Sequence, residues 1–338
     1  MMKAIQFNGK SLNPIERDLR DPRSHEVLLR VQACGICGTD IKILKGESEA
    51  SPPVILGHEF CGIVEETGTQ VTSVKPGDSI SVDPNIACGQ CRFCRKGKVH
   101  LCENLTALGV NIDGGFATHC FVPESQCYHI PPDLPPEQAA LMEPLSCALY
   151  GFQKAEIHSG DAVVVVGGGM IGLLMLKLVM LSPARMVLLV EPDESRRNSG
   201  ISLGADAAFN PHDLRLQEKI RTLTRGGADC VIECVGNIQA VKTAYSLLNR
   251  GGHLILFGVP HPEESFALYP YELFKNDIRI SGSFLNPETF QVAIDLVQSK
   301  KITLDDIEIK TFSLGEIKQA IENQTEHKSL KTVVTMKP

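Results

Sequence analysis

The chain has 338 residues, with 33 lysines and arginines against 40 aspartates and glutamates, and a formal net charge of −7. This length allows about two domains, each with its own hydrophobic core. The acidic balance and the absence of a basic block argue against nucleic acid or an anionic membrane as a partner. The composition, with 43% hydrophobic and 22% charged residues, excludes a disordered or collagen-like chain.

The N-terminus and the cysteines together predict a cytoplasmic protein. Residues 1–8 lack the apolar core and cleavage site of a signal peptide and are expected to form a strand. The longest apolar stretch, 162–181, contains several glycines and a lysine, which favours a buried strand and a core helix over a membrane span. Because a reducing cytosol keeps thiols free, metal ligation is the leading expected use of the twelve cysteines.

The hydrophobic pattern divides the chain near residue 150. Before that point, short β-branched runs separated by Gly, Pro and Asp predict many short strands, among them 27–31, 54–55 and 79–82. From residue 161 onwards, strand and helix patterns alternate, which predicts a parallel sheet with crossover helices. The expected strands are 162–166, 186–190, 230–234 and 253–257. In the tail we expect helices at 290–297 and 314–322 and a strand at 331–336.

A first candidate metal site is dispersed over the β-rich half. Cys37, His58, Glu59 and Glu143 offer one thiolate, one imidazole and two carboxylates, enough for a catalytic zinc with three protein ligands and an open position. Spacing alone leaves a purely structural role open for each residue. A histidine after a glycine often belongs to an ordinary loop, and Glu143 before a proline also fits the start of a helix.

A second candidate metal site is local and far more specific. Four cysteines, Cys88, Cys91, Cys94 and Cys102, lie within fifteen residues of polar loop. Four thiolates at this spacing match a closed, structural zinc site. An iron–sulfur cluster is the rival interpretation, but the bacterial ferredoxin pattern has a shorter last gap followed by proline, whereas glutamate follows Cys102 here. Four loop cysteines without a metal are a further alternative.

The first strand of the alternating half leads directly into a glycine motif. Gly167, Gly169 and Gly172 form G-x-G-x-x-G, with Met170 and Ile171 opening the apolar helix. In this setting glycines allow a tight turn and close backbone approach, and the helix N-terminus attracts a pyrophosphate. A similar turn in a fold that has lost its cofactor is the structural alternative.

An acidic residue after the next expected strand bears on the choice of cofactor. Glu191 is positioned to accept hydrogen bonds from an adenosine ribose, and its charge would repel a 2′-phosphate, so the pattern favours NAD over NADP. Arg196 and Arg197 follow closely and partly offset that repulsion, which keeps NADP open as the less favoured cofactor.

Taken together, these motifs resemble those of the zinc-dependent medium-chain alcohol dehydrogenases, nearest to the branch that acts on sorbitol, threonine and sugar acids. The resemblance extends over essentially the whole chain. It rests on Cys37-Gly-Thr-Asp, Gly57-His-Glu, the four-cysteine segment, the stretch 109–116, Glu143-Pro-Leu and the glycine motif.

The resemblance implies an α/β protein with two domains. A GroES-like β domain, carrying one catalytic and one structural zinc, is expected from residues 1–152 and 286–338. A doubly wound Rossmann domain that binds NAD is expected from residues 153–285. Relatives commonly assemble through the edge of the Rossmann sheet, so a homodimer or homotetramer is expected by analogy.

The resemblance also implies individual roles. Cys37 and His58 resemble the catalytic zinc ligands, with Glu59 as a ligand or exchanging carboxylate. Glu143 occupies a position where classical alcohol dehydrogenases have a cysteine ligand and the polyol branch has a glutamate. Asp40 resembles the carboxylate that orients the histidine ligand, and Thr39 resembles the hydroxyl that takes the substrate proton.

The implied reaction is oxidation of a secondary alcohol, with zinc as Lewis acid and hydride transfer to the nicotinamide. One position departs from the family pattern. The usual proton relay ends in a histidine five positions after the cysteine ligand, and here that position is Lys42. Either Lys42 or water passes the proton on, or Lys42 simply faces solvent.

The substrate is the least determined part of the prediction. By resemblance, Phe284 and Asn286 face the substrate, although Asn286 also fits a turn before Pro287. Polyols and sugar acids are the favoured substrates, and threonine-type amino alcohols are the alternative.

A different class of function also remains open, namely that of a non-catalytic zinc- and NAD-binding redox sensor. It would use the cysteines outside both metal sites, which are Cys34, Cys61, Cys120, Cys127, Cys147, Cys230 and Cys234.

Overall fold

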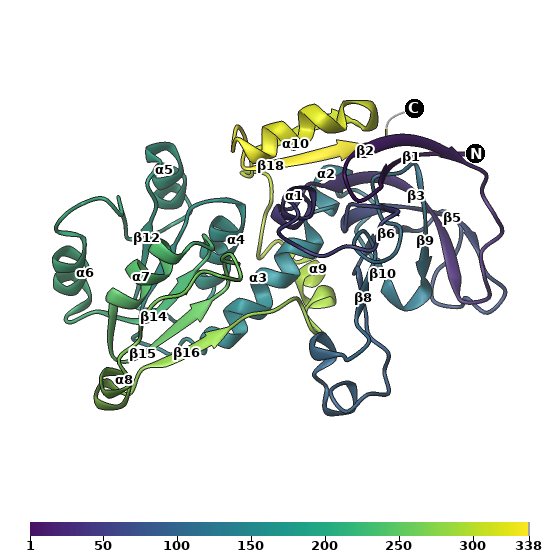
Figure 1. Cartoon of the computed structure of the whole chain (residues 1–338). Helices are drawn as coiled ribbons and strands as arrows, with labels where there is room; N and C mark the ends of the chain where they lie inside the picture. The colour runs from purple at the N-terminus through teal and green to yellow at the C-terminus, as the bar shows by residue number, and fades with distance from the viewer. Residues whose placement is uncertain (337–338) are drawn as a thin grey trace. The chain divides into compact units, whose positions relative to one another are not determined.

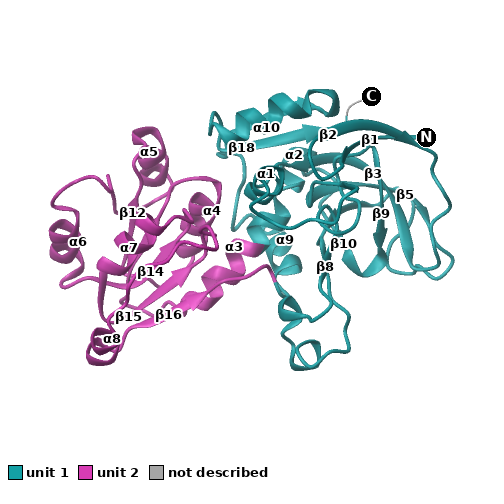
Figure 2. Cartoon of the chain, viewed as in Figure 1, with its two compact units in different colours: residues 1–146, 287–338 teal, residues 147–286 magenta. Residues whose placement is uncertain are grey.

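The computed structural model describes residues 1–336 and divides the chain into two compact units (Figures 1 and 2). Unit 1 combines residues 1–146 with the C-terminal segment that starts at residue 287, and unit 2 consists of residues 147–286. Among the described residues, no helix has both the length and the apolar character needed to cross a membrane.

Unit 1 is built on a seven-stranded sheet in the order β10-β6-β5-β3-β18-β17, with β9 also paired to β3. Its strands are β3 (Glu26–Gly35), β5 (Glu59–Thr67), β6 (Ser79–Val82), β9 (His119–Pro123), β10 (Cys127–His129), β17 (Ile309–Ser313) and β18 (Lys331–Thr335). The pair β17–β18 is parallel, and the others are antiparallel. The mostly β character predicted for the first 150 residues is confirmed.

Smaller elements complete unit 1. The remaining strands form a second sheet, β2-β1-β4, and a two-stranded ladder, β7-β8. These strands are β1 (Met2–Phe7), β2 (Leu12–Arg17), β4 (Val54–Ile55), β7 (Asn85–Ile86) and β8 (Thr106–Ala107). The α-helices are α1 (Gly38–Lys45), α2 (Pro136–Ala139), α9 (Phe290–Gln298) and α10 (Ile317–Thr325), and short 3₁₀ turns lie at Cys94–Lys96, Val99–Leu101, Glu124–Gln126 and Leu314–Glu316.

The junction of β3 and β18 joins the two distant segments of unit 1. Val333 pairs with Gly35 and Val334 with Cys34 in an antiparallel ladder, so the C-terminal strand lies beside the strand that leads to Cys37 (Figure 1). The Ile36 N–H continues this contact by donating to the Thr332 carbonyl at 2.9 Å. The start of the candidate metal site is therefore fixed by hydrogen bonds from the far end of the chain.

Unit 2 is a six-stranded parallel sheet in the order β13-β12-β11-β14-β15-β16. Its strands are β11 (Ala162–Val166), β12 (Met186–Val190), β13 (Ala207–Phe209), β14 (Ala228–Glu233), β15 (Leu248–Leu256) and β16 (Arg279–Gly282). Its helices are α4 (Met170–Val179), α5 (Glu194–Ser202), α6 (Leu216–Thr224), α7 (Ile238–Ser246) and α8 (Pro270–Asn276), and α3 (Met142–Ala155) spans the boundary between the units. The predicted alternation of strands and helices is confirmed.

The strand order of unit 2 reverses at β11, which is flanked by β12 on one side and β14 on the other. All five residues of β11 are buried, because helices cover both faces of a parallel sheet. In such sheets ligands bind outside the carboxyl ends of the strands where the order reverses. The glycine motif follows β11 directly and therefore lies at this position.

Candidate functional sites

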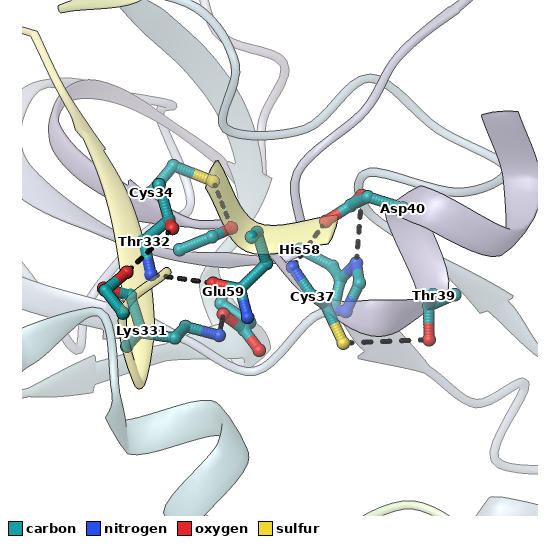
Figure 3. Close-up of polar contacts among 11 residues, drawn as sticks. Cys34, Cys37, Thr39, Asp40, His58, Glu59, Lys331 and Thr332 are labelled. Carbon is teal, nitrogen blue, oxygen red and sulfur yellow. Dashed lines mark hydrogen bonds and ion pairs between the residues drawn. The ribbon is translucent and has the colours of Figure 1, made fainter. Parts of the chain in front are cut away.

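Cys37 and the adjacent residues His58 and Glu59, which lie further along the chain of unit 1, bring their side chains to one place (Figure 3). Cys37 is the N-cap of α1, His58 precedes β5, and Glu59 begins β5. Their donor atoms, one sulfur, one ring nitrogen and one carboxylate oxygen, all lie within 4.8 Å of one another. His58 and Glu59 are buried, with 7% and 1% of their surface exposed. We call this group the Cys37–His58–Glu59 cluster.

Local backbone structure sets the positions of these side chains. The Cys37 N–H donates to Asp40 Oδ2 at 2.8 Å, which closes a capping box at the start of α1. Gly57 has φ +90°, and a Cβ at that position would lie 2.7 Å from both Cys34 Sγ and a Phe116 ring carbon. Only glycine therefore fits the turn that delivers His58 to the cluster.

Asp40 connects the helix cap to the histidine. It is fully buried, and its Oδ1 lies 3.7 Å from His58 Nδ1. Neither of these two atoms has a hydrogen-bond partner among the described residues. A carboxylate beside one ring nitrogen orients the imidazole and favours ligation through the other nitrogen. This geometry suits the role that the resemblance implies for Asp40.

The electrostatics of the cluster favour a cation. Burial by itself lowers the pKa of His58, but the negative charges of Cys37, Asp40 and Glu143 outweigh it and raise that pKa well above its usual value. Burial raises the pKa of the Asp40 carboxyl, and the neighbouring His58 opposes that rise. A thiolate, an imidazole and a carboxylate form a donor set that zinc enzymes use at catalytic sites. The residues present therefore fit a zinc ion.

Glu143 lies outside the close group. It is in the first turn of α3 and is buried, with 7% of its surface exposed. Its negative charge still acts on His58, because it is one of the charges that raise the pKa of this histidine. The structure thus brings Glu59 closer to the cysteine and histidine than Glu143, which leaves Glu143 a more distant candidate ligand.

Thr39 and Lys42 are both on α1, immediately after Cys37. The Thr39 hydroxyl oxygen lies 3.7 Å from Cys37 Sγ (Figure 3). A hydroxyl at this position is close enough to the cluster to reach a group bound there. Lys42 lies about one helical turn further along the chain.

The sequence analysis missed Lys331. Its ammonium forms an ion pair with Glu59 Oε2, and both side chains are buried, with 5% and 2% exposed (Figure 3). Burial lowers the pKa of Lys331, but the charge of Glu59 outweighs it and raises that pKa. The sequence offers one weak signal, a lysine at the start of a strand whose two valines predict burial, because a buried lysine requires a partner.

The four loop cysteines also converge. The sulfurs of Cys88, Cys91, Cys94 and Cys102 lie within 4.8 Å of one another. Hydrogen bonds from the backbone N–H groups of Cys94 and Glu103 lower the pKa of Cys91 to about 6, whereas burial and the bond to Cys91 raise the pKa of Cys94 to about 12. A cation that binds all four sulfurs would displace the remaining protons. The residues present fit a closed tetrahedral zinc site.

In unit 2 the glycine motif forms a tight turn between β11 and α4. Gly167 has φ +102°, and a Cβ on Gly172 would overlap the Gly167 carbonyl oxygen. Gly169 is the N-cap of α4, with Met170 and Ile171 as the first helical residues. The motif therefore has the conformation that a dinucleotide-binding turn needs.

Glu191 is buried at the carboxyl end of β12 and contacts this turn. Its Oε2 accepts the Gly168 N–H at 2.6 Å, and its Oε1 accepts the Asp193 N–H at 2.9 Å. Arg196 lies in the first turn of α5, and its N–H donates to the Asp193 carboxylate at 2.9 Å. The backbone bonds fix the Glu191 carboxylate next to the glycine turn.

The two expected substrate contacts belong to unit 2. Phe284 is 54% exposed, whereas Asn286 is buried with 2% exposed. Between them Leu285 has φ +59°, an unusual conformation for a branched residue. The contact of Phe284 and Asn286 with substrate stays a prediction.

Comparisons with known proteins agree with this geometry. Residues 23–132 match the model of the alcohol dehydrogenase GroES-like domain, and residues 170–299 match that of the zinc-binding dehydrogenases. An L-threonine 3-dehydrogenase from Caldanaerobacter subterraneus subsp. tengcongensis is 35% identical, with 83% of each chain covered. A D-arabinitol dehydrogenase from Uromyces fabae is 32% identical, with 91% of this chain and 89% of the relative covered.

Among solved structures, a zinc-binding dehydrogenase from Sinorhizobium meliloti bound to NADP is 38% identical, covers 99% of both chains and has a TM-score of 0.93. The chain therefore belongs to the zinc-dependent medium-chain alcohol dehydrogenase family, whose members are oxidoreductases. The expected combination of a GroES-like β domain and a Rossmann domain is confirmed.

Proposed function

We propose that this protein is an NAD-dependent dehydrogenase that oxidises a secondary alcohol of a polyol or sugar acid. The observation that carries the proposal is the convergence of Cys37, His58 and Glu59 within 4.8 Å. Zinc bound there supplies a Lewis acid to the substrate hydroxyl. Cys37 and His58 hold the ion, and Glu59 or Glu143 completes its ligand set.

The other residues of the site orient groups and move the proton. Asp40 keeps His58 in the tautomer suited to ligation. The Thr39 hydroxyl accepts the substrate proton and passes it on, to Lys42 or to water. The cysteines 88, 91, 94 and 102 hold the structural zinc, which stabilises their loop.

We assign the dinucleotide to the glycine turn of unit 2. Gly167, Gly169 and Gly172 allow the pyrophosphate to approach the N-terminus of α4, whose first residues are Met170 and Ile171. The Glu191 carboxylate favours the ribose hydroxyls of NAD. The NADP bound by the Sinorhizobium meliloti relative, together with Arg196, makes NADP the alternative to be tested.

A threonine-type amino alcohol is the second candidate substrate, and the 35% identity to a threonine dehydrogenase supports it. The redox-sensor alternative has less support. Burial raises the pKa of Cys61 and Cys230 to about 12 and also raises the pKa of Cys34. Reactive sensor cysteines need the opposite shift, because the thiolate is the form that is oxidised.

Assembly into a homodimer or homotetramer is expected through unit 2. Strand β16 ends its sheet, and the neighbouring α8 segment exposes the rings of Tyr271 and Phe274, which are 68% and 83% exposed. An open sheet edge beside apolar side chains suits pairing with a second copy.

The test is a substrate panel combined with metal analysis. Polyols, hexonates and threonine are offered with NAD or NADP, and the absorbance of the reduced nicotinamide is followed. We expect turnover with NAD on a polyol or hexonate and about two zinc ions per chain. Cys37→Ser should lose one zinc and the activity, whereas Cys127→Ser, outside both clusters, should keep both. Zinc at both sites without turnover on any substrate would contradict the proposal.

A further inference from the structure

Glu233 is a buried acid that has no role in the proposed chemistry. It is the last residue of β14 and has no exposed surface. Its Oε1 accepts the N–H groups of Val235 and Gly236, whereas Oε2 has no hydrogen-bond partner in the described part of the chain. Burial of a carboxyl group costs free energy. What this side chain holds in return is the backbone of the loop that follows β14.

The main chain of the same residue holds a second loop. The Glu233 carbonyl accepts the N–H groups of Phe257 at 3.0 Å and Gly258 at 2.8 Å, directly after β15. The two loops also touch each other, since a Cβ on Gly258 would lie 2.1 Å from the Gly236 nitrogen. Glu233 therefore fastens the loops 234–236 and 257–259, which follow two neighbouring parallel strands.

Both loops lie at the edge of the sheet where the glycine turn begins. Glu233 pairs with Val166, the last residue of β11. A Cβ on Gly167 would lie 2.7 Å from Val235 Cγ2, so the Val235 side chain packs directly on the glycine turn. Val235 and Val259 are nevertheless 47% and 68% exposed. Apolar side chains exposed beside a turn that suits a pyrophosphate offer a contact surface to the apolar faces of a dinucleotide.

We propose that Glu233 is a positioning residue for the dinucleotide, because it orders the loops 234–236 and 257–259 before the cofactor binds. Val235 is then already in place beside the glycine turn. A loop that is held in its bound conformation loses less conformational entropy on binding, which increases affinity. The inference rests on the proposed assignment of the dinucleotide to this turn and adds the residue that shapes its neighbouring wall.

Two substitutions separate the reach of the Glu233 side chain from its charge. Glu233→Gln keeps an oxygen at the same distance and removes the charge, whereas Glu233→Asp keeps the charge but is one methylene shorter. We expect Glu233→Gln to bind NAD as the unmodified protein does, and Glu233→Asp and Glu233→Ala to bind it about 10-fold more weakly. Calorimetric titration of the zinc-loaded full chain with NAD, and with NADP in parallel, measures the dissociation constants.

A matched control distinguishes positioning from a general loss of stability. Val231 is on the same strand and is fully buried, so Val231→Ala leaves a cavity and should lower the melting temperature. It should leave the dissociation constant unchanged. Hydrogen exchange followed by mass spectrometry reports on the loops themselves. The amides of 234–236 should exchange faster in Glu233→Ala and Glu233→Asp than in Glu233→Gln or Val231→Ala.

Three results would overturn the inference. The first is a Glu233→Ala protein that binds NAD as tightly as the unmodified protein. The second is an equal loss of affinity in Val231→Ala, because the effect would then come from general destabilisation. The third is an equal loss in Glu233→Gln and Glu233→Ala, which would assign the effect to charge. Failure of the unmodified protein to bind either dinucleotide would instead contradict the proposed function.

Discussion

Thr39 is the residue on which the proposed proton transfer depends. Its hydroxyl lies next to Cys37 Sγ at 3.7 Å, whereas Lys42 follows about one turn later on α1. Thr39→Ala should lower kcat by about 100-fold, a typical contribution of a positioned proton-transfer group. Lys42→Ala should change the pH–rate profile much less, because Lys42 is only half-buried and water can replace it as a relay group. Steady-state kinetics across pH would measure both, and the reverse ranking would remove Thr39 from the relay.

Glu233 at the end of β14 provides a test of buried charge. It has no exposed surface, and its Oε1 accepts the N–H groups of Val235 and Gly236 at 2.7 and 2.8 Å. Burial raises the pKa of this carboxyl above 4.5, its usual value, despite those hydrogen bonds. A carboxyl whose pKa is higher in the folded than in the unfolded state stabilises the folded protein at low pH. This contribution is lost as the pH rises through the interval between the two pKa values.

Glu233→Gln keeps an oxygen for the two backbone bonds and removes the charge. The difference in melting temperature between variant and unmodified protein should therefore move in favour of the variant as the pH rises from 4 to about 7. Glu156→Gln is the control of opposite sign, because Arg279 lowers the pKa of Glu156 and its contribution is lost as the pH falls. Thermal unfolding at several pH values measures both trends. Parallel trends for the two variants would refute this account of Glu233.

At the scale of elements, the loop with the four cysteines depends on its metal. The segment between β7 and β8 contains two short 3₁₀ turns without buried residues, and of its cysteines only Cys102 is buried. A loop with so little apolar burial gains most of its order from metal ligation.

Cys91→Ser, or treatment with a strong chelator, should make residues 88–104 sensitive to protease while unit 2 stays resistant. Peptide mapping by mass spectrometry would locate the cuts. Cys127→Ser, on β10 of the same unit, is expected to leave the loop intact. Unchanged resistance of the loop after loss of the metal would show that its order has another source.

The elements differ in how well sequence predicts them. Strands β11 and β12 match their expected ranges, because buried parallel strands are continuous apolar runs. Strand β15 begins five residues before its expected start at 253, since Gly251 and Gly252 interrupt the apolar pattern and its pairing with β14 contains a bulge. Such an irregularity depends on the neighbouring strand and leaves little trace in local sequence.

At the scale of the whole molecule, the candidate sites also differ in how well the sequence predicts them. The four cysteines and the glycine motif are predictable because each site is formed within one short segment. The Cys37–His58–Glu59 cluster needed a family resemblance, since Cys37 is separated in sequence from His58 and Glu59. Lys331 was not predicted, because its ion pair with Glu59 depends on the pairing of β18 with β3, which only the complete fold defines.

The placement of β18 has a consequence for how this protein is made. A ribosome produces β3 and β5 early but delivers β18 only after the whole of unit 2. At about 5–20 residues per second, the nascent Glu59 waits on the order of tens of seconds for Lys331. During that interval the Glu59 carboxylate lacks its ammonium partner, and the edge of β3 that pairs with β18 has no partner strand either. Assembly of unit 1 is therefore complete only when the last strand has been made.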